Sequence, residues 1–259
     1  APKNDYNNSK TKVLALANKY NITAIAIGNG TASRETQEFF AKINKDENVK
    51  LNYTVVSEAG ASVYSASKLA QEEYPKLDVT IRGAISIAQR LRDPMATLVK
   101  IDPKSLGIGQ YQHDVNQKLL EKKLSDVTED LVNRVGVDIN SASASLLYHV
   151  AGLSQKLAHN IIDYRDEEGE FRTKSELLKV KGIGKKAYEQ AAGFIRIIEG
   201  KTAFDNSGIH PENYHVAKEI YKLELTKIDI SQKAKELNIG EETLKDIIKE
   251  LQKPGFDPR

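Results

Sequence analysis

The sequence contains no cysteine and no tryptophan, and its single methionine is Met95. The lack of cysteine excludes disulfide bonds and thiolate metal sites, and it favours a reducing compartment, for which the cytoplasm is the default. No apolar run approaches the ~20 residues that a membrane-spanning helix needs, so we expect no membrane contact. Because the chain begins at Ala1 rather than at a methionine, we interpret it as an excised part of a longer protein.

The chain also lacks a large net charge. Its 259 residues include 38 basic and 36 acidic side chains, for a formal net charge of +2. Overall charge therefore indicates no particular partner, and any attraction for a polyanion must be local. Residues 172–186 hold six basic side chains against one acid, Glu176, for a net charge of +5. The six are Arg172, Lys174, Lys179, Lys181, Lys185 and Lys186.

The first part of the sequence alternates helical and strand-like patterns. Strand, helix and strand in that order predict a parallel strand pair with a right-handed crossover. Asp93-Pro94 then indicates the end of the last helix of this part. The expected elements are, in order, helix 10–20, strand 23–28, a helix capped by Thr31 or Ser33, strand 51–60, and helices 62–73 and 80–92.

From residue 113 onward the pattern is helical, and residues 138–197 contain an internal repeat. At an offset of 30 residues Gly152 aligns with Gly182, and Lys156 aligns with Lys186. This period predicts two stacked helix–turn–helix units with a shared core. The other expected elements are a linking helix over 113–134 that ends at Gly136, helices near 211–224, 230–237 and 241–251, and a linker-like end, PGFDPR, at 254–259.

The repeat also carries the candidate binding residues. Each glycine turn places a helix start, with its free N–H groups and positive dipole end, beside a lysine, and this combination suits a nucleic-acid phosphate. Glycines that only allow close helix packing are the alternative for a single turn, but two copies in register favour phosphate binding. The candidate residues are Lys181, Gly182, Ile183, Gly184, Lys185 and Lys186 in the second copy, and Gly152, Leu153, Ser154 and Lys156 in the first.

Two resemblances rest on longer stretches. Residues 135–190, from VGVDIN to KKAYEQ, resemble the tandem helix-hairpin-helix domain of DNA-uptake and repair proteins, which binds nucleic-acid backbone through its hairpins. In that comparison Ser154 replaces the second glycine of the first hairpin, and Tyr188 stands where a small residue is usual. Upstream, AIGNGTASRET, VVSEAGASVYSAS, RGAISIAQRLRDP and KIDPKSLGIGQYQHDVNQ resemble the Tex family of bacterial transcription accessory proteins.

The second resemblance implies a fold and partners. It implies a truncated RNase H-like α/β domain of the YqgF type, followed by all-α parts and then by an OB-fold RNA-binding domain. On this resemblance we expect the first three strands of the RNase H-like sheet and the OB-fold domain to lie outside this chain. The implied partners are RNA and/or DNA, together with RNA polymerase or other transcription machinery. The expected division is 1–106 for the partial YqgF domain, 107–136 for the linking helix, 137–200 for the tandem helix-hairpin-helix domain, and 201–259 for a small helical domain and linker.

A nuclease activity is the first alternative to plain binding. Metal-dependent cleavage needs carboxylates that converge on a divalent ion. Glu58 is a weak metal candidate, and a role in capping the helix near Ala61 is favoured over ligation. The resemblance places Arg82 where nucleases of this fold have an acid, and a cation there would repel the metal. We therefore expect a non-catalytic protein without a cofactor, and an architectural module that contacts other proteins is the second alternative.

Overall fold

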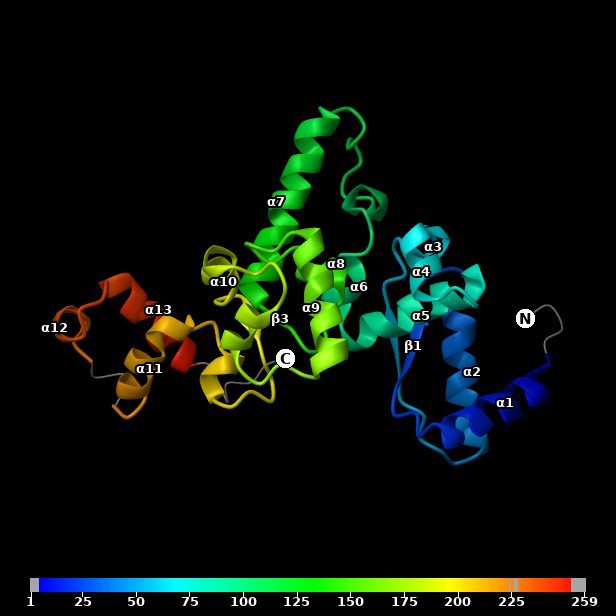
Figure 1. Cartoon of the computed structure of the whole chain (residues 1–259). Coiled ribbons are helices and arrows are strands. Elements are labelled where there is room, and N and C mark those ends of the chain that lie inside the picture. The colour runs from blue at the N-terminus through cyan, green and yellow to red at the C-terminus, as the bar shows by residue number, and fades with distance from the viewer. Residues whose placement is uncertain (1–4, 224, 226–227, 253–259) are drawn as a thin grey trace. The chain divides into compact units, whose positions relative to one another are not determined.

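A computed structural model of the chain describes residues 5–223, 225 and 228–252. The predicted linker-like end at 254–259 lies outside these residues. The fold divides into two compact units, with the division between Val115 and Asn116. Each unit is described by itself (Figure 1).

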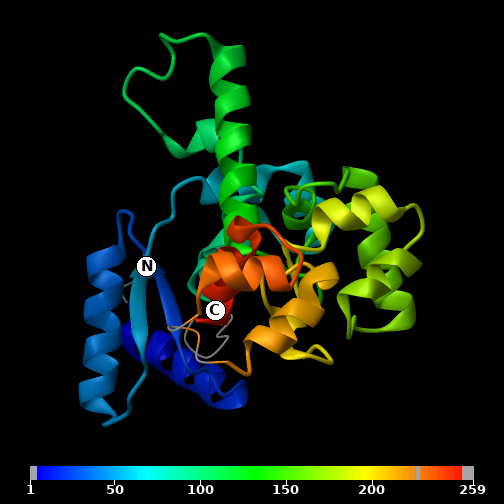
Figure 2. The same ribbon diagram turned by 90° about the vertical axis from the view of Figure 1, so that its left-hand side faces the viewer.

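The first unit contains a two-stranded parallel sheet with helices around it. Strand β1 (Ile25–Gly28) pairs with β2 (Tyr53–Val56), and Ile25 lies opposite Tyr53. Figure 2 shows the two strands side by side. The crossover between them is a helix, so the predicted strand–helix–strand unit is confirmed. The helices of this unit are α1 (Tyr6–Lys19), α2 (Ser33–Asp46), α3 (Ala61–Ala66), α4 (Lys68–Glu73), α5 (Val79–Arg92), α6 (Pro94–Leu98) and the 3-10 turn η1 (Pro103–Leu106).

Two local predictions in this unit are wrong. The helix expected over 62–73 is broken at Ser67, whose extended backbone ends α3 and whose hydroxyl accepts from the N–H of Ala70 to begin α4. A serine inside an apolar helical pattern gives little sign of such a break, because its capping geometry competes with the helix only locally. Helix α2 begins after Ala32 without a side-chain cap, so neither Thr31 nor Ser33 is its N-cap.

The second unit begins with the longest helix of the described residues. Helix α7 (Gln117–Val135) starts at Asn116, whose side chain accepts from two backbone N–H groups, and ends at Gly136 with φ +83°. A Cβ at Gly136 would lie 2.6 Å from the guanidinium carbon of Arg196, so glycine is required both for the backbone angle and for this close approach. The predicted end of the linking helix is therefore confirmed.

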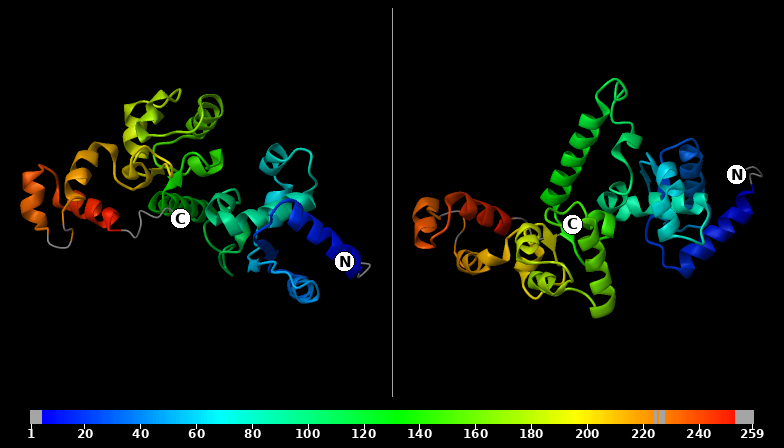
Figure 3. Two further views of the ribbon diagram at one scale, coloured as in Figure 1. Left: turned by 90° about the horizontal axis from the view of Figure 1, so that it is seen from below. Right: turned by 45° about the horizontal axis from the view of Figure 1, so that its top comes forward.

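Short helices fill the rest of the second unit. Helices α11, α12 and α13 cluster together in both views of Figure 3, around a core that includes Val216, Ile220, Leu244 and Ile247. The helix expected near 211–224 is shorter than predicted and begins with a 3-10 turn. The elements are α8 (Ala144–Leu147), α9 (Gln155–Glu168), η2 (Lys174–Lys179), α10 (Lys185–Ala191), η3 (Ala203–Asn206), η4 (Pro211–Asn213), α11 (Tyr214–Ile220), α12 (Ile230–Glu236) and α13 (Glu241–Leu251).

A small parallel ladder joins the two ends of the repeat. Strand β3 (Val137–Asp138) pairs with β4 (Ile195–Arg196). The sequence pattern predicts this region to be entirely helical and does not reveal the ladder, because two-residue strands carry no detectable alternation. The ladder brings the entry and exit of the repeat together and buries Val137 and Ile195.

Candidate nucleic-acid interface

The two glycine turns of the repeat have the same backbone. We call residues 150–156 the first hairpin and residues 180–186 the second hairpin. Gly152 has φ +83° and Gly182 has φ +87°, angles that side chains with a Cβ rarely adopt. An extended N-cap residue then starts helix α9 in the first copy and helix α10 in the second. The predicted repeat is therefore present in the backbone.

The apolar side chain of each turn packs into the protein core and does not face solvent. Leu153 and Ile183 were both expected to touch nucleic acid, but their side chains are buried, with exposed fractions of 6% and 5%. That part of the prediction is wrong for the side chains. A buried aliphatic residue between two exposed ones fixes the turn to the core. The backbone N–H of each is also used within the turn, since Leu153 donates to the carbonyl oxygen of Val150 at 3.0 Å and Ile183 donates to that of Val180 at 3.1 Å.

Each glycine also allows close contact with the other copy of the repeat. A Cβ on Gly152 would lie 2.6 Å from Cβ of Gln190 and 3.1 Å from the carbonyl oxygen of Ala187, both in α10. A Cβ on Gly182 would lie 3.2 Å from a methyl carbon of Leu157 in α9. Both glycines therefore combine a positive φ with close packing against the other copy. Neither seals the turns, because both glycines are exposed to solvent.

The helix starts beside the hairpins differ in how many amides they leave open. In the first copy the Ser154 hydroxyl accepts from the N–H of Leu157 at 3.3 Å and so uses one amide. In the second copy Gly184 precedes α10 without any side-chain cap. Apart from its chain neighbours, no atom of the described residues lies within 4 Å of the position where a Cβ on Gly184 would stand, so the space beside this N-cap residue is open. The second hairpin thus offers more amide donors to an anion.

The lysines of the second hairpin are exposed. Among the described residues neither Lys181 nor Lys186 has a carboxylate within ion-pair distance. Lys185 lies 3.7 Å from Glu189, a solvent-exposed pair of little energetic weight. Lys156 of the first hairpin is also exposed. Three exposed lysines therefore belong to the second hairpin, and one belongs to the first.

The predicted basic patch at 172–186 presents less positive charge to solvent than its formal charge of +5 indicates. Lys174 is only 1% exposed, and its ammonium donates to the carbonyl oxygens of Ser207 at 2.8 Å and Ile209 at 3.2 Å. Arg172 and Lys179 lie within ion-pair distance of nearby carboxylates. A count of charges along the sequence cannot separate an inward lysine from an outward one, so the predicted patch is correct only at the turn itself.

Burial changes the chemistry of Lys174. Desolvation lowers the pKa of Lys174 to about 7, and the nearby guanidinium of Arg196 acts in the same direction. The carboxylates of Asp205 and Glu250 oppose this shift. Lys174 therefore belongs to the junction between the repeat and the helices that follow, not to the binding surface.

Tyr188 explains one departure from the usual hairpin sequence. Its ring centroid lies 6.2 Å from that of His210, which precedes η4. Burial raises the pKa of Tyr188, and the carboxylates of Asp205 and Glu212 raise it further. A tyrosine here fills the junction with the following helices, where a small residue would leave a gap.

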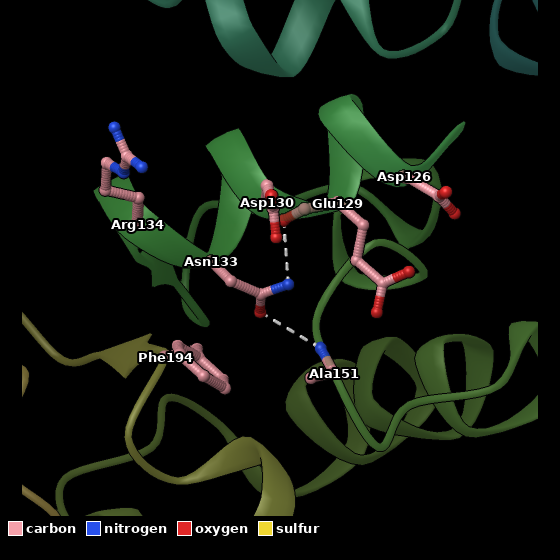
Figure 4. Close-up of a pocket in the computed structure, with 7 residues that line it drawn as sticks. All are labelled: Asp126, Glu129, Asp130, Asn133, Arg134, Ala151 and Phe194. Carbon is pink, nitrogen blue, oxygen red and sulfur yellow. Dashed lines mark hydrogen bonds between the residues drawn. The ribbon is translucent and has the colours of Figure 1, made fainter. Parts of the chain in front are cut away.

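An acidic cavity lies beside the first hairpin. Asn133 of α7 donates to the carbonyl oxygen of His149 at 3.0 Å and accepts from the N–H of Ala151 at 3.0 Å, so it ties the hairpin to the helix. Figure 4 shows Asn133 between the helix and Ala151, with Phe194 below it. The cavity has a volume of about 500 Å³ and is lined by Asp126, Glu129, Asp130, Asn133, Arg134, Ala151 and Phe194.

The carboxylates of this cavity weaken the first hairpin as an anion site. Asp126, Glu129 and Asp130 outnumber Arg134, and like charge near a phosphate is repulsive. Sequence reasoning missed these residues. Their spacing of three and four positions along a helix was a usable signal, because it places them on one face.

In the first unit, Glu58 does not have the expected role. Helix α3 has Gly60 as its N-cap, with φ +70° and no side-chain cap, so Glu58 does not cap it through its carboxylate. The Glu58 carboxylate lies over the loop after β1, where a Cβ on Gly28 or Gly30 would overlap its oxygens. The two glycines therefore make room for this side chain.

Arg82 is structural. It is 8% exposed, and its guanidinium donates to the carbonyl oxygens of Tyr74 at 3.2 Å and Ser65 at 3.5 Å. In the part of the chain that the structure describes, no group of three or more His, Asp or Glu side chains is arranged to hold a metal ion. No helix in the same described part is long and apolar enough to span a membrane.

Comparisons with known proteins cover most of the chain. Residues 1–92 match the family described as the Tex protein YqgF-like domain. Residues 132–196 match the helix-hairpin-helix motif, and residues 202–259 match a second family described as an HHH domain. The predicted order of an α/β part followed by all-α parts is thereby confirmed.

The chain is also similar to several longer proteins. It is 52% identical to Protein YhgF of Escherichia coli over 95% of this chain and 34% of that protein. It is 50% identical to Transcriptional accessory protein Tex of Neisseria gonorrhoeae over 98% of this chain and 35% of that protein. It is 50% identical to human S1 RNA-binding domain-containing protein 1 over 72% of this chain and 19% of that protein. The chain spans about a third of the bacterial relatives, and it belongs to the Tex family.

Proposed function

We propose that the chain binds the sugar–phosphate backbone of nucleic acid through its second hairpin. One observation carries the proposal: the second hairpin combines the uncapped start of α10 at Gly184 with the exposed Lys181, Lys185 and Lys186. Free amides and ammonium groups at one helix start form the donor set that phosphate oxygens accept from. The match to a helix-hairpin-helix family supports the same reading.

The first hairpin plays a lesser part in this proposal. Its backbone is available at Gly152 and Ser154, and Lys156 adds one positive charge. The Ser154 cap removes an amide, and the acidic cavity lies alongside. A phosphate contacts it more weakly than it contacts the second hairpin.

Binding of this kind reads no sequence. Phosphate contacts fix position and affinity, whereas base edges carry sequence information. The same contacts ignore the 2′-hydroxyl, so RNA and DNA are both ligands of this surface.

The role is non-catalytic. Glu58 lies over a glycine loop, and Arg82 is held by carbonyl oxygens at a position where nucleases of this fold have an acid. Branched or single-stranded substrates incubated with Mg²⁺ or Mn²⁺ are expected to stay intact. Cleavage that disappears in Glu58→Gln would instead establish a nuclease.

The proposed role of the whole protein in the cell rests on the names of its relatives. One of them is named as a transcriptional accessory protein and another as an S1 RNA-binding protein, which supports a place in transcription. Contact with RNA polymerase and joint action with an OB-fold domain of the same protein belong to this proposal, as does a cytoplasmic location.

The decisive experiment is charge reversal in the second hairpin. Lys181→Glu, Lys185→Glu and Lys186→Glu together are expected to weaken binding to all oligonucleotide sequences alike. The log–log salt dependence should flatten by about 0.7 to 0.9 for each phosphate that the variant no longer binds. The matched control reverses three exposed lysines of α7, Lys118, Lys122 and Lys123.

The control separates the hairpin from net charge, because both triple variants change the charge equally. Equal weakening by the two variants would mean that only overall charge matters. Unchanged affinity in the hairpin variant would favour the architectural role, in which the repeat contacts protein partners.

A further inference from the structure

A large apolar side chain stands exposed just before each hairpin. Tyr148 precedes the first hairpin by two positions, and Leu178 precedes the second by the same interval, so the two align in the repeat. Their exposed fractions are 53% and 48%, although the residues that begin the hairpins, Val150 and Val180, are buried. Single exposed apolar residues are common on protein surfaces, but repetition of one beside both glycine turns indicates a shared use.

Local packing holds Tyr148 beside the first hairpin. Its backbone N–H donates to the carbonyl oxygen of Ala144 at 2.9 Å, at the end of α8. Its ring centroid lies 5.4 Å from that of His149, and the carbonyl oxygen of His149 accepts from Asn133 at 3.0 Å. Tyrosine has few rotatable bonds, so this half-exposed ring offers a flat contact surface at a low cost in conformational entropy.

The two hairpins lie close enough to contact one strand. A Cβ on Gly152 would lie 3.1 Å from the carbonyl oxygen of Ala187, in the first turn of α10. In the other direction, the side-chain amide of Asn160 in α9 donates to the carbonyl oxygen of Lys181 at 2.7 Å. Each turn thus contacts the helix of the other copy, and Tyr148 and the lysines of the second hairpin belong to one compact part of the repeat.

We infer that Tyr148 stacks on an unpaired base of a nucleic-acid strand whose phosphates are bound by the second hairpin. The inference rests on the proposed function, and it assigns the form of the ligand as single-stranded. Every base has a π-face, so an aromatic side chain accepts any base that is free of its partner strand. The aliphatic Leu178 has no such ring, so the second copy supplies charge and the first supplies the stacking surface.

The carboxylates beside the first hairpin do not oppose this contact. An unmodified base is neutral, so Asp126, Glu129 and Asp130 repel a phosphate without repelling a stacked ring. The first hairpin can therefore be a weak phosphate site and still bind a base from a strand that the second hairpin holds.

Affinity measurements on the full 259-residue chain test the stack. The ligands are a labelled single strand of about 12 nucleotides and a duplex of the same length. Tyr148→Ala is expected to weaken single-strand binding by about fivefold or more, as the loss of one stacked base predicts, and to leave duplex binding unchanged. Tyr148→Phe keeps the ring and should restore the affinity, whereas Tyr148→Leu should not. Leu178→Tyr should raise single-strand affinity, because it adds a ring beside the second hairpin.

The absence of tryptophan allows a direct readout of the contact. In Tyr148→Trp the new indole is the only one in the chain. Its fluorescence should be quenched by the single strand but not by a strand of equal length and charge in which abasic sites replace the bases. The matched control is Tyr20→Trp, at a similarly exposed tyrosine that follows α1, and its fluorescence should respond to neither strand.

The outcomes separate this inference from the proposed function. Equal weakening of strand and duplex in Tyr148→Ala, no weakening of either, or equal quenching by the abasic strand would overturn the stack and leave the proposed function in place. If reversal of Lys181, Lys185 and Lys186 leaves both ligands bound as tightly as before, the proposed function fails and the inference fails with it. Thermal unfolding of each variant checks that the repeat remains folded.

Discussion

The first and second hairpins share a backbone but differ in their surroundings. Both have a positive-φ glycine followed by a buried aliphatic residue and an extended N-cap. The second has an uncapped helix start and three exposed lysines, whereas the first has a serine cap, one exposed lysine and a cavity lined by carboxylates. The two copies are thus more alike in the backbone of the turn than in the side chains around it, and it is these side chains that decide how well each hairpin binds an anion.

The comparison depends first on the glycines themselves. Gly152→Val should destabilise the chain by about 3 to 5 kcal/mol, because it combines a disfavoured φ with a clash against α10. Gly184→Ala should cost less than about 0.5 kcal/mol, since its φ is negative and its space is open. Denaturant unfolding of both variants measures the difference, and equal losses would contradict the packing described for Gly152.

The second copy also differs through Lys174, which aligns with Ala144 of the first copy. Its pKa is lowered to about 7 by burial, against an ordinary value of 10.5. Between these values the unfolded chain binds the extra proton, so the free energy of unfolding should rise with pH, by at most about 1.4 kcal/mol per pH unit. Unfolding measured from about pH 7 to pH 9 avoids the opposing effect of Tyr214, whose pKa is raised by burial.

Lys174→Met should remove this contribution to the slope. A matched substitution at an exposed lysine, Lys222→Met, should leave the slope as it is in the wild type. An unchanged slope in Lys174→Met would mean that another group carries the pH dependence.

The acidic cavity offers a way to make the first hairpin resemble the second. Neutralising it with Asp126→Asn, Glu129→Gln and Asp130→Asn should raise affinity for single-stranded RNA or DNA by about threefold at low salt, because repulsion near the first hairpin is removed. The gain should shrink in high salt. The control is the same type of neutralisation at Asp163, Asp166 and Glu167 on α9, and an equal gain there would show that the cavity has no special effect.

The smallest expected effect concerns Ser154. Ser154→Gly gives the first hairpin the second glycine of the other copy and frees the N–H of Leu157. Removal of the serine cap should cost only a few tenths of a kcal/mol. Affinity should rise slightly, and only in the variant with the neutralised cavity should the gain exceed the error of a titration.

Much of the fold could be predicted because its signals are local. Apolar runs marked β1 and β2, Gly136 marked the end of α7, and Asp93 before Pro94 marked the end of α5. The two-residue strands and the break at Ser67 escaped prediction, since neither changes the hydrophobic period over enough residues.

The candidate site was predictable in position but not in detail. The lysines beside Gly184 are exposed as the pattern indicated. The inward orientation of Lys174 depends on carbonyl groups more than thirty positions away, which no local pattern contains.

The ladder between β3 and β4 has a consequence for how the chain can be rebuilt. The chain enters and leaves the repeat at neighbouring points, as inserted modules commonly do. The tandem hairpins can therefore be exchanged between Val137 and Arg196 without redirecting the polypeptide on either side, but the exchanged segment has to keep Lys174 and Tyr188, which contact residues after it.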